Sequence, residues 1–205
     1  MTAPAIAGRQ GAGLVFLLLK WRAQTLIVLG LQQRALATFE DMRVRWPDDA
    51  YVLASHAALR AETGAVVAAI ADLRVLVARH PDDAAGWFNL GFLLEQEAEL
   101  AEAQSAFSRA VDLNPQLDRA WYGLGLALIR LGRHAEAIAA FKRNTELQPM
   151  SPYGWYQMAR AHMDLQQPEE AARILRHLRG FEPKVAAQLE RETGLGAAAA
   201  GTQAA

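Results

Sequence analysis

The sequence contains no cysteine, and this absence excludes several kinds of site at once. Without a thiol the chain can form no disulfide, no thiolate metal site and no lipidated cysteine. The absence fits the reducing cytoplasm, which is the location that we expect for this protein.

The chain also lacks an excess of either charge, because 21 Lys and Arg stand against 22 Asp and Glu. Nucleic-acid-binding proteins carry a basic excess, so we predict no nucleic-acid partner. The sequence has no Gly-Lys-Ser/Thr phosphate loop, no Gly-x-Ser-x-Gly nucleophile turn and no His-Glu-x-x-His metal motif. We therefore predict no metal, no cofactor and no catalytic residue, and a protein that is not an enzyme.

One pattern occurs twice between Ala84 and Ser151, with the same internal spacing in both copies. Its first copy is Trp87, Leu90, Gly91, Leu94, Ala103, Phe107, Ala110 and Pro115, and its second is Trp121, Leu124, Gly125, Leu128, Ala137, Phe141, Asn144 and Pro149. A fixed period of about 34 residues, such as separates these copies, is typical of a helix-turn-helix solenoid. The pattern W-x2-L-G-x2-Y…A-x3-F…P resembles the tetratricopeptide repeat (TPR), with leucine at the tyrosine position.

This resemblance implies an all-α fold: a right-handed superhelical solenoid of about five helix-turn-helix TPR units, followed by a C-terminal capping helix. The same period extends through most of the chain in three registers. Prolines recur at Pro47, Pro81, Pro115, Pro149 and Pro183. Alanines stand twelve residues earlier, at Ala35, Ala69, Ala103, Ala137 and Ala171. Large apolar residues stand eight residues before the prolines, at Phe39, Leu73, Phe107, Phe141 and Leu175.

Each repeat position has a physical reason. A small residue lets two antiparallel helices approach closely, and the bulky residue fills the remaining gap. The proline stops the second helix. Gly30, Gly64 and Gly132 lie where a left-handed residue ends the first helix. Ala98 and Gln166 replace this glycine, so we expect those turns to differ in geometry or to carry strain.

The predicted domain boundaries follow from the repeats. We expect a flexible arm over residues 1–12, a solenoid over 13–195 and a flexible Ala/Gly tail over 196–205. The five repeats are predicted at 16–49, 50–83, 84–117, 118–151 and 152–185, with Asp83, Asp118 and Ser151 as helix N-caps. KVAAQLERETGL, after Pro183, is predicted to form the capping helix.

Gly13–Gly30 is an unusually apolar stretch with two interpretations. A membrane span is disfavoured because Lys20 and Arg22 lie in its middle, each at a cost of about 2.5–3.5 kcal/mol. Ala23 and Ala35 keep the repeat register, which favours the first helix of the solenoid. Membrane contact through this stretch remains the alternative.

The remaining polar features have structural explanations. His56 and His162 occupy positions where other repeats carry Leu or Met, so we expect both to pack at the seam between helices. The doublets Asp48-Asp49 and Asp82-Asp83 follow a proline and precede a helix, which favours capping over acid-base chemistry.

Large side chains beside the core stripe are the candidate partner-binding site. Phe88 and Phe92 lie about 100° around their helix from Trp87 and Gly91, so the core does not require them. In the family this face lines the concave groove. Ala54 and Ala58, the equivalent positions one repeat earlier, predict a pocket beside the aromatics. The predicted groove residues are Tyr51, Phe88, Asn89, Phe92, Arg119, Tyr122, Leu126, Arg130, Tyr153, Tyr156 and Arg160.

Two functions stay open on the sequence. The first is a protein-interaction adaptor or scaffold in a bacterial cytoplasm, binding a peptide or partner segment in the groove. The second is a membrane-associated assembly factor or secretion-type chaperone that uses the apolar N-terminal helix. Aromatic packing between helices is the structural alternative for the groove residues.

Overall fold

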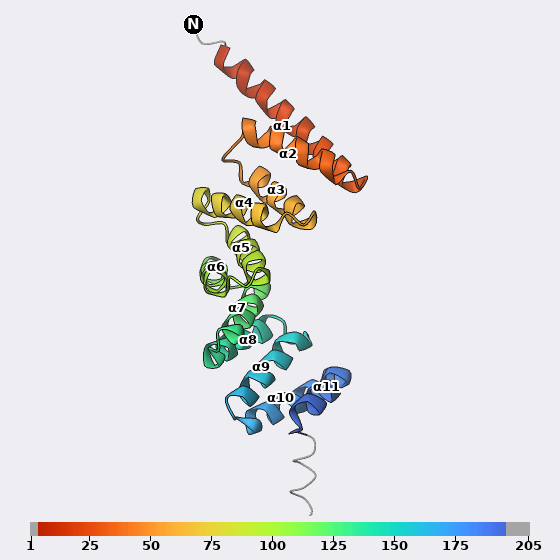
Figure 1. Ribbon diagram of the computed structural model, residues 1–205, viewed down its shortest axis with the longest axis vertical. Coiled ribbons are helices and arrows are strands. Elements are labelled where there is room, and N and C mark those ends of the chain that lie inside the picture. Colours follow the sequence, from red (N-terminus) through yellow and green to blue (C-terminus); the bar gives the residue numbers. More distant parts are fainter. Residues whose placement is uncertain (1–3, 196–205) are drawn as a thin grey trace, which may run out of the picture. The chain divides into compact units, whose positions relative to one another are not determined.

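A computed structural model describes residues 4–195 of the chain. Within this range the chain forms eleven α-helices and no β-strand, and short turns join successive helices (Figure 1). The helices divide into two compact units, one ending at Leu93 and the other beginning at Leu94. The predicted all-α fold, built from helix-turn-helix pairs, is confirmed.

The first unit holds the apolar N-terminal stretch. It contains α1 (Pro4–Val28), α2 (Gln32–Arg45), α3 (Ala50–Glu62), α4 (Val66–Arg79) and most of α5 (Ala84–Gln96). α1 packs on α2, α2 on α3, and α3 on α4. The core beneath α1 is formed by Ala23, Leu26, Ala35, Phe39, Met42, Val52 and Leu59.

The second unit holds the repeats of Trp121 and Trp155 and the second helix of the repeat that begins at Ala84. After the end of α5 it contains α6 (Leu100–Leu113), α7 (Asp118–Arg130), α8 (His134–Leu147), α9 (Pro152–Asp164), α10 (Pro168–Phe181) and α11 (Pro183–Thr193). Each helix from α6 to α11 packs on the next one in the chain, and α11 also packs on α9. α11 is the capping helix that the sequence predicts after Pro183.

The alanines of the repeat register are fully buried, which confirms their predicted role. Ala35, Ala69, Ala103, Ala137 and Ala171 are all inaccessible to solvent. The bulky residues four positions further on are also buried. In the α7–α8 pair, Phe141 packs so closely on Gly125 that a Cβ there would lie 2.4 Å from the ring. This close approach explains the small residue at position 125.

The turns inside the helix pairs share one left-handed residue. Gly30, Gly64 and Gly132 have φ of 72°, 85° and 73°. Ala98 and Gln166 adopt the same conformation, with φ of 63° and 57°. The turn geometry is therefore the same in all five helix pairs, and the expected alternative of a different geometry at Ala98 and Gln166 does not occur. These two turns therefore carry strain, since the left-handed region costs a side-chain-bearing residue about 1–2 kcal/mol.

In the three repeats that contain it, the tryptophan is hydrogen-bonded to the proline that precedes the repeat. The indole Nε1 of Trp87 donates a hydrogen bond of 3.0 Å to the carbonyl oxygen of Pro81. Trp121 and Trp155 repeat this bond, each at 2.9 Å, six residues after their own proline. The bond holds the entry to the first helix against the end of the preceding one. Sequence reasoning missed it, although the constant spacing from proline to tryptophan was visible.

The helix starts confirm the predicted capping by Asp49 and Asp83 and the predicted cap position of Ser151, and they correct the prediction for Asp118. Asp49 accepts a hydrogen bond from the Val52 amide, and Asp83 accepts bonds from two amides of α5. Asp118 is not an N-cap: it is the first residue of α7, and Leu117 caps the helix without a side-chain bond. The reason is register, because Leu117 and not Asp118 is the equivalent of Asp83 one repeat later. Ser151 occupies the cap position of α9, but its side chain makes no capping bond.

The N-terminal helix is longer than the sequence predicts. α1 begins at Pro4 rather than Gly13, so most of the expected flexible arm is helical. The small residues of this segment include good helix formers, and helix elongation is cheaper than nucleation once α1 has formed. Residues 1–3 and the predicted tail at 196–205 lie outside the described residues.

Candidate functional site

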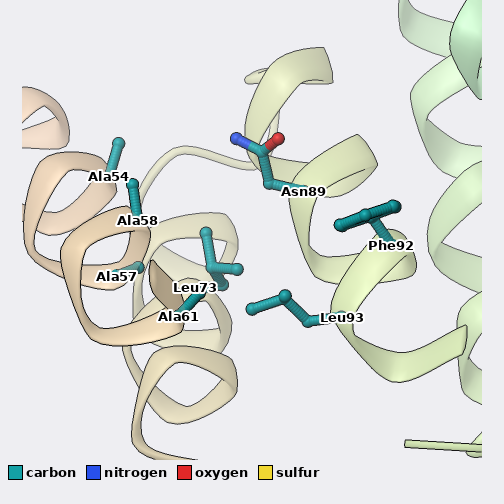
Figure 2. A pocket seen from close by; sticks show the side chains of 8 residues that line it. All are labelled: Ala54, Ala57, Ala58, Ala61, Leu73, Asn89, Phe92 and Leu93. Atoms are coloured by element: carbon teal, nitrogen blue, oxygen red, sulfur yellow. The ribbon is translucent and has the colours of Figure 1, made fainter. Parts of the chain in front are cut away.

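An apolar pocket lies in the first unit, where α3 faces α5 (Figure 2). Its volume is about 160 Å³. The lining consists of alanines from α3, Leu73 from α4, and three residues of α5: Ala54, Ala57, Ala58, Ala61, Leu73, Asn89, Phe92 and Leu93. The sequence predicts a pocket beside Ala54 and Ala58, and the structure contains it.

The pocket arises from a difference between consecutive repeats. Ala54, Ala57, Ala58 and Ala61 follow the i, i+3, i+4, i+7 pattern, so they share one face of α3. The positions one repeat after Ala54 and Ala58 hold Phe88 and Phe92. Methyl groups on α3 leave space that the larger side chains of α5 border but do not fill. The pocket is therefore a consequence of sequence rather than of an irregular backbone.

Phe92 and Asn89 supply the accessible groups of the pocket. Phe92 is 47% exposed, which is unusual for a phenylalanine, and its ring stacks on that of Phe88 at 6.4 Å between centroids. The Asn89 side chain is exposed, and its amide makes no hydrogen bond to any described residue. An accessible ring, an apolar wall and a free amide can together receive an apolar side chain and one backbone group.

Tyr51, another predicted groove residue, has a structural environment. Its ring lies 6.3 Å from that of Phe16 and 6.4 Å from that of Phe39. The ammonium group of Lys20 sits 4.2 Å from the centre of the Tyr51 ring. Tyr51 thus joins α3 to α1 and α2, and it does not line the pocket.

The second unit holds the other predicted residues, in mixed surroundings. Tyr122 is half-buried, with its ring 5.8 Å from that of Phe141, and Leu126 is also half-buried. Arg119 is exposed. Arg130 donates to the carboxylate of Glu95 at 2.5 Å and to its carbonyl at 2.8 Å. Tyr122 and Arg130 are therefore engaged within the unit.

Tyr153, Tyr156 and Arg160 lie on α9. Tyr153 is largely exposed. Burial raises the pKa of Tyr156, and the hydrogen bond that its hydroxyl donates to Glu192 of α11 raises it further. The Arg160 guanidinium lies 5.8 Å from the Tyr156 ring. The capping helix thus engages Tyr156 and leaves Tyr153 as the accessible aromatic of this helix.

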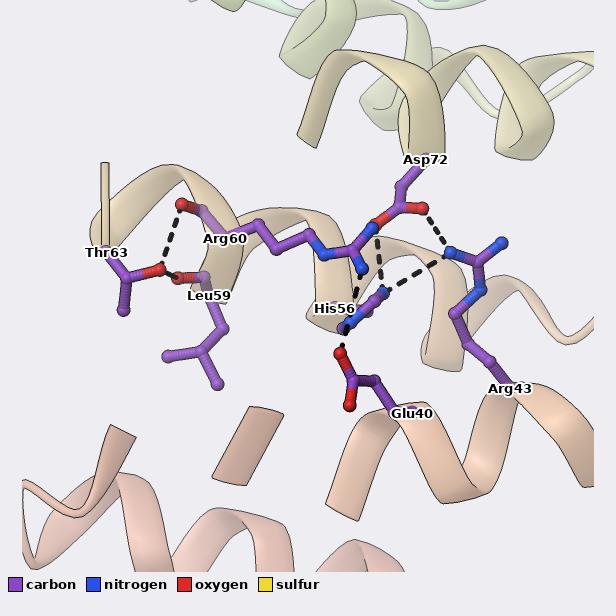
Figure 3. Close-up of polar contacts among 7 residues, drawn as sticks. All are labelled: Glu40, Arg43, His56, Leu59, Arg60, Thr63 and Asp72. Atoms are coloured by element: carbon purple, nitrogen blue, oxygen red, sulfur yellow. Dashed lines mark hydrogen bonds and ion pairs between the residues drawn. The ribbon is translucent and has the colours of Figure 1, made fainter. Parts of the chain in front are cut away.

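A buried ion-pair cluster joins α2, α3 and α4 and was not foreseen from the sequence (Figure 3). Its centre is Asp72, whose side chain is 3% exposed. The carboxylate contacts Arg43, the Nδ1 of His56 at 2.9 Å and a guanidinium nitrogen of Arg60 at 2.9 Å. His56 is fully buried, as predicted for the seam between helices, and its Nε2 has no partner among the described residues. His162 is half-buried, with its Nδ1 2.8 Å from Gln167.

The electrostatics of this cluster favour an ionised carboxylate. Burial acts to raise the pKa of Asp72, but the hydrogen bond and charge interaction with His56 outweigh it, together with the charges of Arg43 and Arg60. The net effect lowers the pKa of Asp72. Among the described residues, no group of three or more His, Cys, Asp or Glu could hold a metal ion. The cluster joins α2, α3 and α4 through the one buried carboxylate of Asp72.

The repeats of this chain match models of a known protein family. Two tetratricopeptide repeat models match the chain, one at residues 61–118 and 93–152 and the other at 128–190. The chain belongs to the tetratricopeptide repeat family. The TPR matches begin within α3, so the predicted repeat at 16–49, which has leucine at the tryptophan position, lies outside them. No curated protein matches this TPR chain.

Solved TPR structures share the fold at low sequence identity. A crystal structure of MamA is 22% identical, with a TM-score of 0.75, and the match covers 79% of this chain and 88% of that one. MamA from Desulfovibrio magneticus RS-1 is 19% identical, with a TM-score of 0.72 and coverages of 85% and 94%. YrrB, described as a TPR protein with an unusual peptide-binding site, is 19% identical, with a TM-score of 0.74 and coverages of 82% and 88%. At this identity the likeness shows the fold.

Proposed function

We propose that this protein is an interaction scaffold that binds a peptide or partner segment through the pocket between α3 and α5. The observation that carries the proposal is an open apolar pocket bordered by the half-exposed Phe92. Exposing an aromatic ring to water is unfavourable, and interface centres are enriched in such rings. The peptide-binding site of YrrB, a TPR protein of similar fold, supports the same class of function.

The pocket also defines the kind of residue that it accepts. An engineered cavity of about 150 Å³ takes a benzene ring, so a pocket of 160 Å³ suits one side chain such as Leu, Met or Phe. The lining side chains carry no charge, which disfavours an ionised residue inside the pocket. Asn89 stands beside it as donor and acceptor for the backbone of an extended peptide.

The other predicted groove residues are secondary candidates for contact with the partner. Arg119 and Tyr153 are exposed and suit a second contact surface within the second unit. Tyr51, Tyr122 and Tyr156 are half-buried, and Arg130, like Arg119, already interacts with another group. We propose a non-catalytic role in a bacterial cytoplasm, which the alanine-rich, cysteine-free composition supports.

Peptide selection on the full chain tests this function. A phage-displayed library of random peptides is selected on the immobilised protein, and the Kd of each synthetic peptide is measured by fluorescence anisotropy. We expect the peptides to share one apolar residue. Ala58→Leu fills the pocket from an exposed position, so it should weaken binding roughly tenfold or more. Ala71→Leu, on an exposed site of α4 outside the pocket, is the matched control.

Phe92→Ala separates binding from packing. If Phe92 is a contact for the peptide, the change weakens binding by about 1–2 kcal/mol and leaves the melting temperature close to that of the wild type. If the ring only packs between helices, the free energy of unfolding falls by about 3 kcal/mol or more. Peptides that bind Ala58→Leu as tightly as the wild type, or a selection without peptides, would refute the proposed site.

A further inference from the structure

The outer face of α1 is apolar and uncovered in the first unit. Leu14, Leu18, Trp21 and Val28 recur at intervals of four, three and seven residues, which places them on one side of the helix. Trp21 is 69% exposed and Val28 is 85% exposed. We define the outer face by its exposed large apolar residues: Leu14, Leu17, Leu18, Trp21 and Val28.

The opposite side of α1 is used by the fold. Ala23 and Leu26 are buried in the core with α2, and Phe16 and Leu19 pack against that core. α1 is therefore apolar on both sides, although within the described part of the first unit only one side has a protein partner (Figure 1). A helix that is apolar all round requires a second apolar environment.

The polar residues of the stretch do not interrupt the outer face. The Lys20 side chain extends toward α3, where its ammonium group lies over the Tyr51 ring. Thr25 falls within the apolar stripe, but its hydroxyl donates to the Trp21 carbonyl in the same helix, at 2.9 Å. Arg22 is exposed, and at about 100° from Trp21 around the helix it lies at the edge of the outer face. The Lys20 charge, which argues against a membrane span in the sequence, thus lies on the protein side.

Charge is distributed unevenly between this end of the chain and the rest. Residues 1–46 carry six Lys and Arg but only two acidic residues, whereas residues 47–205 carry 15 basic and 20 acidic residues. Arg22, Arg34 and Arg45 are exposed. A basic excess beside an apolar face is attracted to anionic lipid headgroups. Two copies of the same basic segment would instead repel each other.

We infer that the outer face of α1 docks on the surface of a membrane that contains anionic lipids. Among the described residues, no helix is both long enough and apolar enough to cross a bilayer. The helix therefore lies along the surface, with Leu14, Leu18 and Trp21 at the boundary between headgroups and acyl chains. Arg22, at the edge of the outer face, contacts the headgroups, and the basic excess of residues 1–46 attracts the segment to them. This docking is independent of the pocket between α3 and α5.

Vesicle cosedimentation of the full chain tests the inference. The probes are vesicles of pure phosphatidylcholine and vesicles with about 30 mol% phosphatidylserine. We expect binding to the anionic vesicles, and a decrease as NaCl rises from about 0.1 M to about 1 M, because the Debye length falls from about 10 Å to about 3 Å. The double variant Leu18→Gln/Trp21→Gln should lower the partition coefficient roughly tenfold or more.

The control removes exposed apolar groups from elsewhere. Val67→Gln/Met150→Gln changes two largely exposed residues away from α1 and should bind vesicles as the wild type does. Circular dichroism confirms that each variant is folded. Equal loss of binding in the control, or wild-type binding in the Leu18/Trp21 variant, overturns the inference. The inference is also overturned if the wild type does not bind vesicles. One such case would be a wild-type dimer, detected by light scattering, that the Leu18/Trp21 variant does not form.

Discussion

Asp72 lies between cationic groups of α2 and α3, and its ionisation contributes to the stability of the first unit. Its pKa in the folded protein is below its ordinary value of 3.8. A carboxyl group with a depressed folded pKa stabilises the fold above the unfolded pKa. That contribution is lost as pH falls through the folded pKa. Stability falls as pH is lowered because the unfolded chain takes up a proton at Asp72 before the folded protein does.

We predict that Asp72→Asn lowers the free energy of unfolding at pH 7 by about 3 kcal/mol, because the change leaves Arg43 and Arg60 without their buried anion. The difference between wild type and variant should shrink as pH falls below the ordinary pKa of 3.8, because the unfolded wild-type chain then takes up a proton that the folded carboxylate does not yet bind. Urea titrations at pH 7, 5 and 3.5 measure both quantities. A difference that is constant across these pH values would show that the charge of Asp72 is irrelevant to stability.

Ala98 and Gln166 hold a backbone conformation that suits glycine. We predict that Ala98→Gly and Gln166→Gly each raise the free energy of unfolding by about 0.5–1 kcal/mol, since the relief of left-handed strain exceeds the entropy that glycine loses on folding. Thermal and urea unfolding measure the change. Gly132→Ala is the reciprocal control. The added Cβ would meet open space, so the expected loss of about 1 kcal/mol in the free energy of unfolding comes from the backbone conformation and not from a steric clash. Destabilisation by either glycine would contradict this account.

At the scale of helix pairs, the distance between α7 and α8 is set by small residues. Gly125→Ala would place a Cβ within 2.4 Å of the Phe141 ring, which is fully buried and cannot move freely. We predict a loss of about 1–3 kcal/mol for Gly125→Ala, and a similar loss for Ala137→Leu, because both overpack the pair. Ala135→Leu, at an exposed position of α8, is the control. Unchanged urea midpoints for both core variants would refute the repeat register.

The repeat register could be predicted from the sequence because every repeat makes the same physical demand. Buried alanines and bulky fillers recur once per repeat, and glycine occupies the left-handed turn position in three of the five repeats. This recurrence shows which positions matter. Periodicity does not identify partners. The bond from the indole of Trp121 to the Pro115 carbonyl depends on a side-chain rotamer, and the Asp72 cluster depends on three helices meeting. Asp118 shows a related weakness, since an error of one residue changes a cap into a helical position.

The candidate site was predictable where a residue differs from its equivalent in the next repeat. Ala54 and Ala58 against Phe88 and Phe92 predict the pocket by size alone. The same comparison could not separate accessible aromatics from packed ones. Tyr122 is the equivalent of Phe88 one repeat later, and Tyr51 extends the same predicted face, yet both pack on neighbouring rings. Whether such a side chain is accessible or packed depends on contacts between helices, which the repeat spacing does not determine.

At the scale of the whole molecule, stability is expected to be local. In repeat proteins each repeat contacts only its neighbours, so unfolding free energy is a sum of repeat and interface terms. The chain divides into two compact units, and the described interactions of Asp72 and of Gly125 lie within one unit each. A defect at one site should therefore loosen its own unit before it affects the other.

Hydrogen exchange measures this locality directly. We predict that Asp72→Asn speeds amide exchange in α2–α4 roughly a hundredfold, the equivalent of about 3 kcal/mol, and leaves α8–α10 near wild-type protection. Gly125→Ala should do the reverse, with faster exchange in α7 and α8 and little change in α2–α4. Each variant serves as the control for the other. Uniform loss of protection through all helices in either variant would mean that the two units unfold together, and nearest-neighbour coupling would then be strong enough to make the array one cooperative unit.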